Sequence, residues 1–255
     1  MQRAAGEIVV EYPLDLVADF IEPWCAAAAE IVTGSDPSER PALLAAARIV
    51  SDSAAEPKDG DLQSRASAAN AELERYFAAR SSIPMAGATF VAMARTLACL
   101  LANGWLGLLR QTHALAQLWQ DAALIPKATE ELLRYSCLPQ AVFRCASQSV
   151  VLAGVKLGEG DRIVLRLASA NRDPLQFSDP DRIDFTRRGA AGISLGFGPH
   201  SCVGASLIRM AATVATRVFV ERFGAFELDR PVHWRGGDGF RSPAALRVRA
   251  ATSRG

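Results

Sequence analysis

The sequence has few of the residues that build metal centres and disulfide frameworks. Its 255 residues include five cysteines and three histidines, and no two cysteines stand in a Cys-x-x-Cys pair. This composition argues against a zinc site and against a secreted disulfide scaffold. Neither sign of charge dominates, because 28 basic and 27 acidic residues leave a net charge of +1. Since there is no basic run either, we expect no nucleic-acid partner and no membrane partner.

Long hydrophobic runs are scarce as well. Residues 1–7 lack the apolar stretch of a signal peptide. The longest apolar run, residues 97–109, is interrupted by Asn103. It is too short to cross a bilayer and suits a buried core helix. We therefore expect a soluble cytoplasmic protein.

The hydrophobic patterns predict helices first and strands later. Half of the residues are apolar, which is enough for one sizeable core. Helical spacing predicts helices over 15–33 (broken at Pro23), 42–50, 62–79, 89–109, 127–135 and 203–223. Short strands are predicted over 148–155 and 162–167 and around Phe226 and Leu246. The expected fold is mainly α with a small β part, in a single domain.

The sharpest local signal is a glycine-rich loop, residues 195–204, with the sequence Leu-Gly-Phe-Gly-Pro-His-Ser-Cys-Val-Gly. Its glycines permit close backbone approach and unusual dihedral angles. It delivers Cys202 to the start of a helix, whose free N–H groups and dipole stabilise a thiolate. A single thiolate suits haem iron, because the porphyrin supplies the equatorial ligands. The alternative is a buried structural cysteine.

This loop resembles the cysteine loop of the cytochrome P450 superfamily, Phe-Gly-x-Gly-x-His-x-Cys-x-Gly. It matches at every position except the first, where Leu195 replaces Phe. The resemblance implies a haem b whose iron is ligated by Cys202. It also implies a set of cofactor-binding residues, of which the first two contact the haem propionates: Arg144, His200, Leu195, Gly196, Gly198 and Gly204.

Further landmarks of the family follow in the same order. Glu131-Leu132-Leu133-Arg134 resembles its Glu-x-x-Arg helix, and the spacing of three places the two charged side chains on one helix face. Residues 171–174 and 180–184 resemble the next two landmarks. The resemblance implies that Arg182 completes a structural ion network with Glu131 and Arg134, which braces the loop behind the haem.

Two departures concern the length of the chain. Met1 aligns well inside a family member, so we expect a truncated P450-like fold without the family's N-terminal region. Residues 77–89 replace a much longer family segment. On this interpretation residues 1–125 form a helical part, and residues 126–255 form the haem-binding half with the cysteine loop. The distal face of the haem would then be open, or capped by a partner protein or a second subunit.

A third departure lies in the family's oxygen-activation motif, which aligns with residues 92–97. Thr96 keeps the hydroxyl, but Arg95 replaces the acid and Met93 replaces the glycine. In peroxide-using members an arginine at the acid position binds a substrate carboxylate, so catalytic roles follow for Thr96 and Arg95. We prefer a simpler interpretation of Arg95, as an ion-paired or solvent-facing residue. An alignment with a deletion here would remove even Thr96 from the motif.

Two functional hypotheses result. The first is a haem-thiolate tailoring enzyme of specialised metabolism that acts on a small-molecule substrate by peroxide-driven or redox-neutral chemistry, with a ferredoxin as a possible electron donor. The alternative is a haem-free auxiliary protein that stabilises or activates a partner enzyme such as a glycosyltransferase. The cysteine loop favours the first, and the degraded oxygen motif favours the second.

Overall fold

The structure, a computed structural model, describes residues 13–188, 192–223, 226–237 and 239–250. Its helices are α2 (Glu22–Thr33), α3 (Arg40–Ala55), α4 (Gly60–Ala78), α5 (Ala86–Val91), α6 (Leu97–Arg110), α7 (Thr112–Gln120), α8 (Ile125–Ser136), the short α9 (Leu167–Ala170) and α10 (Ala205–Arg222). π-helical turns precede α2 at Leu16–Ile21 and join α5 to α6 at Ala92–Thr96. Short 3₁₀ turns lie at Pro37–Glu39, Ala122–Leu124 and Gly198–His200.

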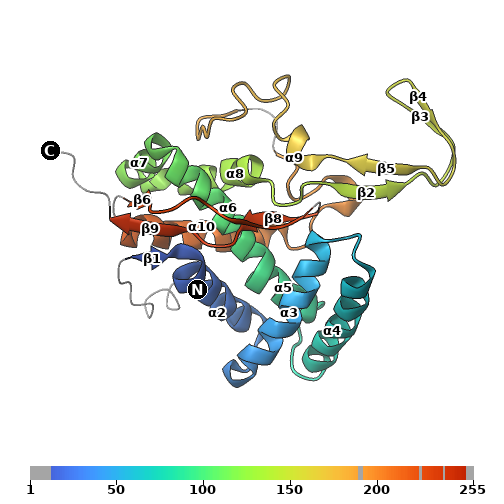
Figure 1. Ribbon diagram of the computed structural model, residues 1–255, viewed down its shortest axis with the longest axis horizontal. Coiled ribbons are helices and arrows are strands. Elements are labelled where there is room, and N and C mark those ends of the chain that lie inside the picture. Colours follow the sequence, from blue (N-terminus) through green and yellow to red (C-terminus); the bar gives the residue numbers. More distant parts are fainter. Residues whose placement is uncertain (1–12, 189–191, 224–225, 238, 251–255) are drawn as a thin grey trace.

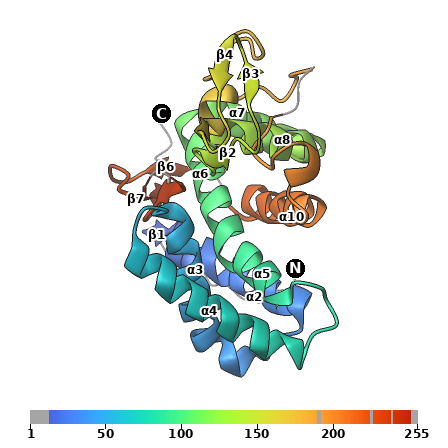
Figure 2. The ribbon, with the colours of Figure 1, turned by 90° about the vertical axis from the view of Figure 1, so that its right-hand side faces the viewer.

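The centre of the fold is the rod formed by α5, the π-helical turn and α6. Figure 2 shows it running between the group α2–α4 and the group of α8 and α10. Every residue of α6 except the last is buried, as its apolar sequence requires. A Cβ on Gly107 would lie 2.7 Å from the ring of Tyr135, so glycine at this position lets α8 approach α6. On the other side, Trp105 stacks on Phe219 of α10 with ring centroids 4.3 Å apart.

The continuous rod is longer than the apolar run suggested. Within the described residues, one helix, Ala86–Arg110, is long and apolar enough to cross a membrane. However, 89% of its most apolar window is buried inside the protein. It therefore has the surroundings of a core helix.

The strands of the described residues form four small sheets. β1 (Leu14–Asp15), β9 (Arg247–Ala250) and β6 (Phe226–Leu228) make an antiparallel sheet in that order. The other pairs are β2 (Val142–Cys145) with β5 (Arg162–Leu165), β3 (Val150–Leu152) with β4 (Val155–Leu157), and β7 (Trp234–Gly236) with β8 (Arg241–Pro243). The hairpins β2–β5 and β3–β4 form an arm that extends from the body (Figure 1).

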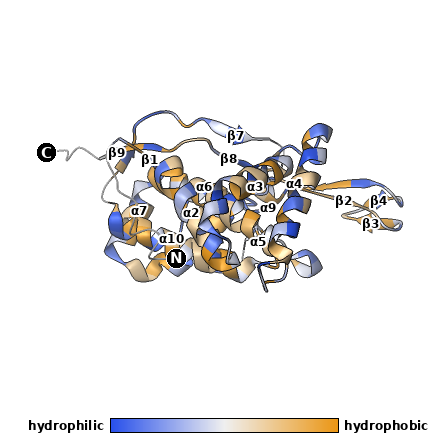
Figure 3. Cartoon of the chain, turned by 90° about the horizontal axis from the view of Figure 1, so that it is seen from below, coloured by the Kyte–Doolittle hydropathy of each residue, from blue (hydrophilic) through white to orange (hydrophobic). Residues whose placement is uncertain are grey.

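The arm is apolar although much of it is exposed. Phe143 is 47% exposed and Val151 is 66% exposed. Figure 3 shows hydrophobic residues along the arm as well as on the helices of the body. Exposed large apolar side chains that are grouped in this way are typical of contact surfaces.

The expected fold class, mainly α with a small β part, is confirmed. Pro23 does not break its helix, because it lies in the first turn of α2, where a missing N–H costs little. Helix α7 was not predicted, and it follows α6 after the single residue Gln111. Since the helical apolar spacing continues with hardly an interruption, it did not mark a separate helix.

Candidate functional site

A cavity of about 450 Å³ lies between the central rod, the start of the arm and the loop 195–204. Its volume falls within the usual range for ligand pockets. Apolar side chains make most of its wall: Leu97, Leu100, Leu138, Val142, Leu165, Leu167, Ile193, Ile208 and Phe240. The polar side chains that line it include Thr96, Arg144, His200 and Cys202. Such a cavity fits a large apolar group that carries polar substituents.

The thiol of Cys202 reaches the cavity because the loop folds back on itself. The N–H of Cys202 donates to the carbonyl oxygen of Leu195 at 2.7 Å, and the N–H of Gly196 donates to Ile193 at 2.9 Å. The carbonyl of Cys202 accepts from the N–H of Ala205, the first residue of α10, at 3.1 Å. Cys202 is therefore an exposed thiol at the N-terminal end of a long helix, as the sequence indicated.

Two glycines in the loop have left-handed backbone conformations, with φ of 77° at Gly196 and 69° at Gly198. Their surroundings differ. A Cβ on Gly196 would lie 2.8 Å from the carbonyl oxygen of His200, whereas a Cβ on Gly198 would meet nothing within 4 Å. Only at Gly196 do both the backbone conformation and the lack of room for a side chain require glycine.

These two positions give a matched test of the loop. We expect Gly198→Ala to lower the free energy of unfolding by about 1 kcal/mol, the ordinary cost of a left-handed residue. Gly196→Ala should cost about 2–3 kcal/mol, since the added methyl group must also push the His200 backbone away. Urea unfolding of the two variants measures the difference. Equal costs would contradict the packing described for Gly196.

The structure brings six of the predicted site residues to this cavity: Thr96, Arg144, Leu195, Gly196, His200 and Cys202. Thr96 comes from the end of the π-helical turn in the central rod. Arg144 lies on β2, exposed, and its Nη1 donates to the carbonyl oxygen of Phe143 at 2.7 Å. Gly198 and Gly204 belong to the loop but do not line the cavity.

Arg95 does not line this cavity, although it is the neighbour of Thr96. It is 5% exposed, and its Nη1 lies 2.9 Å from Oε1 of Glu22 on α2. Arg235 contacts the same carboxylate oxygen at 3.1 Å. The structure thus shows Arg95 ion-paired with Glu22, which is the interpretation preferred from the sequence. A catalytic role for Arg95 stays a prediction.

The pKa of Glu22 is lowered by this arrangement. Burial raises it, but the charges and hydrogen bonds of Arg95 and Arg235 together outweigh burial. Folded Glu22 therefore releases its proton at a lower pH than the unfolded chain does. Its contribution to stability is complete above about pH 4.5 and is lost as the pH falls through the depressed folded value.

The free energy of unfolding of the Glu22→Gln variant should accordingly change less with pH in the acid range than that of the unchanged protein. We expect the free energy of unfolding of the unchanged protein to fall more steeply between about pH 5 and pH 3 than that of the variant. The reason is that the unchanged protein has one more ion-paired carboxylate, Glu22, which must take up a proton. Urea unfolding across this range measures both slopes. Glu72→Gln, at an exposed position on α4, is the control and should keep the steep slope. Parallel slopes for all three proteins would contradict the assignment.

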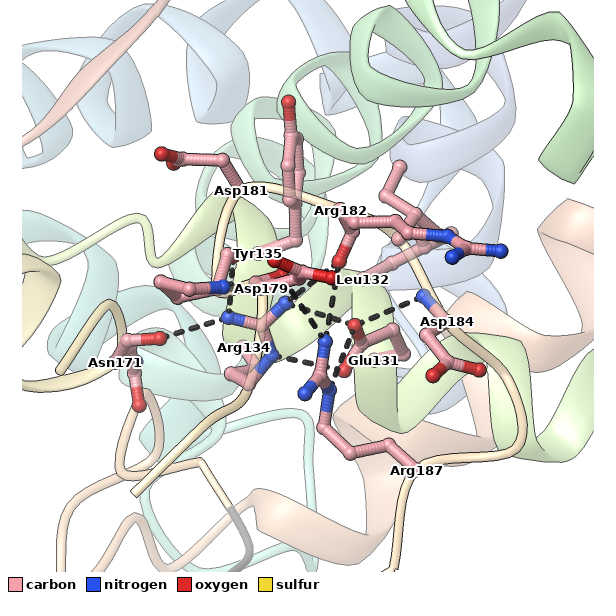
Figure 4. A network of polar contacts seen from close by, with 12 residues as sticks. Glu131, Leu132, Arg134, Tyr135, Asn171, Asp179, Asp181, Arg182, Asp184 and Arg187 are labelled. Atoms are coloured by element: carbon pink, nitrogen blue, oxygen red, sulfur yellow. Dashed lines mark hydrogen bonds and ion pairs between the residues drawn. The ribbon is translucent and has the colours of Figure 1, made fainter. Parts of the chain in front are cut away.

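The structure pairs Glu131 with Arg134, two of the three residues of the predicted ion network, in the C-terminal half of α8 (Figure 4). Arg134 is 2% exposed and binds Glu131 through two hydrogen bonds, Nε to Oε2 at 2.8 Å and Nη2 to Oε1 at 2.7 Å. Its Nη1 donates to the carbonyl oxygens of Asn171 and Pro180 at 2.8 and 2.9 Å. Arg134 therefore anchors two points of the chain that lie 37 and 46 positions after it in the sequence.

The third guanidinium of the network is not that of Arg182, so the prediction that Arg182 completes the network was wrong. Arg182 contributes its backbone carbonyl, which accepts from Arg134 at 3.3 Å, and its side chain points away from Glu131 (Figure 4). Arg187 takes the predicted place, with Nε 3.3 Å from Oε1 of Glu131. A turn in which the N–H of Thr186 donates to Asp184 returns the chain toward α8. Sequence spacing does not reveal that turn.

Asn171, noted in the sequence only as part of a landmark, links this network to the loop. It is fully buried, and its Nδ2 donates to Oγ of Ser194 at 2.8 Å. Its Oδ1 accepts from the N–H of Ile193 at 2.8 Å, and Oγ of Ser194 donates to the carbonyl oxygen of Leu133 on α8 at 2.6 Å. Ile193 and Ser194 lead directly into Leu195. The network thus fixes the entry to the cysteine loop.

Comparisons with known proteins agree with this geometry. A family model described as Cytochrome P450 matches residues 116–232. The chain is 37% identical over 150 residues to the biotin biosynthesis cytochrome P450 of Bacillus subtilis. The aligned stretch covers 58% of this chain and 38% of that protein. It is 38% identical over 146 residues to cytochrome P450 monooxygenase PikC of Streptomyces venezuelae, 57% of this chain and 35% of that protein. The matched region thus spans little more than a third of either relative.

Solved structures show the same architecture. The crystal structure of CYP105P1 in complex with filipin I has a TM-score of 0.84 and 26% identity, covering 98% of this chain and 71% of that one. The structure of Mycobacterium smegmatis CYP164A2 with econazole bound has a TM-score of 0.87 and 23% identity, and the match covers 97% of this chain and 71% of that one. At this identity the likeness concerns the fold alone. Fold and site define a mainly helical protein with one cysteine loop beneath an apolar cavity. The chain belongs to the cytochrome P450 family.

Proposed function

We propose that this chain is a haem-thiolate protein of specialised metabolism, a tailoring enzyme that acts on a small organic substrate. The observation that carries the proposal is the convergence of Cys202, Arg144 and His200 on one apolar cavity. The relatives support it, since the family in general holds a haem iron through a cysteine and includes the monooxygenase PikC.

The residues around the cavity fit a haem. Apolar side chains such as Leu100 and Val142 face the space that a porphyrin would need, and the exposed thiol of Cys202 could reach the iron. Arg144 carries a two-pronged donor suited to a carboxylate, and His200 offers a second polar group. Haem b has the matching features, a broad apolar ring with two carboxylates. On this proposal residues 126–255 form the haem-binding half of a single domain.

When bound, a haem with a thiolate ligand supplies one-electron and oxygen chemistry. Cys202 Sγ would hold the iron, and Arg144 and His200 would orient the carboxylates. Thr96 would present its Oγ1 to the cavity as a proton donor or hydrogen-bond partner.

The cavity offers Thr96 no acidic neighbour. None of the described residues that line it is Asp or Glu, and Arg95 is bound to Glu22 instead. An acid–alcohol pair that delivers protons is therefore not formed by the described lining. This supports peroxide-driven or redox-neutral chemistry over ordinary hydroxylation with dioxygen.

Haem content tests the proposal. The chain, expressed with a haem precursor and purified, should contain about one haem per chain. Pyridine haemochrome analysis measures the ratio, and circular dichroism shows whether the sample is folded. A folded protein that takes up no haem would reject the proposal.

The second candidate is a haem-free auxiliary protein that stabilises a partner enzyme. The exposed apolar side chains of the arm, Phe143, Val150, Val151, Leu152, Val155 and Val164, favour it. Such a surface could dock on another protein. Co-purification of a folded, haem-free chain with one enzyme, lost in a variant with charged residues on the arm, would support this function.

A further inference from the structure

A second cavity, of about 270 Å³, lies behind one wall of the main cavity. We call it the arginine pocket, because Arg110, Arg172 and Arg241 line it together with Tyr135 and Trp234. No Asp or Glu is among the described residues that line it. Three cations that share a small space repel one another unless an anion joins them.

Two of the three guanidinium groups lie over aromatic rings. Arg172 lies 4.2 Å above the ring of Tyr135, donates to the Tyr135 carbonyl oxygen at 2.8 Å and pairs with Asp181. Arg241 lies 4.3 Å above the ring of Trp234. Within the described part of the chain, neither Arg110 nor Arg241 has a carboxylate partner. Among the described residues, two of the three positive charges therefore have no carboxylate paired with them.

The wall between the two cavities consists of two extended segments joined by a β-bridge between Pro139 and Phe240. Leu138, Pro139 and Phe240 line the main cavity, whereas Cys137, Gln140 and Arg241 line the arginine pocket. Gln140 Nε2 donates to the carbonyl oxygen of Cys137 at 2.9 Å and holds the segment in place.

The backbone of Arg241 is anchored to the core. Asn103 of α6, which is 7% exposed, donates from Nδ2 to the Arg241 carbonyl oxygen at 2.8 Å. The ring of Trp234 supports its guanidinium from below. Arg241 is thus positioned by a buried amide of the core at its backbone and by an aromatic ring at its guanidinium.

From this arrangement we infer that the arginine pocket binds a phosphate-type oxyanion, a compact dianion with several acceptor oxygens. Guanidinium forks match phosphate oxygens in two-pronged hydrogen bonds. A dianion would balance the two charges of Arg110 and Arg241, and Arg172 could add a donor without leaving Tyr135. A monovalent carboxylate offers fewer acceptors and less charge, so it should bind more weakly.

Isothermal titration of the full chain with inorganic phosphate, at constant ionic strength, tests this inference. We expect one phosphate per chain, bound more tightly than acetate, and no saturable binding of chloride. Arg110→Gln and Arg241→Gln should each weaken phosphate binding about tenfold or more. Both residues are exposed, so the variants should fold, which circular dichroism checks. Arg217→Gln on α10 is the matched control and should bind phosphate like the unchanged chain.

Unchanged phosphate affinity in the double variant Arg110→Gln/Arg241→Gln would overturn the inference. So would equal responses to phosphate and chloride, because they would show only general screening. The measurement needs no haem, so its result stands apart from that of the proposed function.

Discussion

Replacing Arg134 with alanine is expected to lower the free energy of unfolding by about 3–5 kcal/mol. The substitution leaves the carboxylate of Glu131 buried and takes the guanidinium from the carbonyl oxygens of Asn171 and Pro180. Contacts of Glu131 with Arg187 and with the N–H of Asp184 remain and limit the loss. Urea unfolding at neutral pH measures the change.

The control is an exposed ion pair between α8 and α10. Glu130 pairs with Arg209 of α10 at 2.6 Å, but both side chains are largely exposed. Arg209→Ala should therefore cost no more than about 1 kcal/mol. Losses of similar size for the two variants would contradict the view that burial, rather than the presence of an ion pair, makes the Arg134 network important.

Replacing Cys202 with alanine is expected to weaken haem binding by more than about 100-fold. Loss of a group that only supports a metal ligand already costs 10–100-fold, and Cys202 would be the ligand itself. The thiol is exposed, so its removal should leave the fold intact. Titration of the haem-free protein with haemin, followed by absorbance, measures the affinity.

Cys145→Ala is the matched control, because Cys145 is also an exposed free cysteine but lies on β2. Its haem affinity should equal that of the unchanged chain. If Cys145→Ala lost haem while Cys202→Ala kept it, the assignment of the ligand would be wrong.

Sequence patterns predicted the parts of the site that depend on local order. The cysteine loop is one continuous segment, and the helix that follows it sets the position of Cys202. Glu131 and Arg134 are three residues apart on one helix, so helical geometry alone brings them together. The central helix was predictable because its apolar run has no alternative to burial.

The arrangements that the sequence did not reveal depend on how the chain turns and packs in space. Arg95 faces Glu22, which is 73 positions away in the sequence, and no pattern in the sequence connects the two residues. Arg187 replaces Arg182 in the network because a turn reverses the chain between them. The arginine pocket unites residues from α6, from the segment after α9 and from β8, which only the packing of these elements brings together.

The most direct test of the central claim is the absorption spectrum of the purified, reduced protein with carbon monoxide. If Cys202 ligates a haem iron through its thiolate, the spectrum should show the carbon monoxide band of a thiolate-ligated haem. A band of the histidine-ligated type, or no haem band from folded protein, would contradict a haem-thiolate centre in this chain.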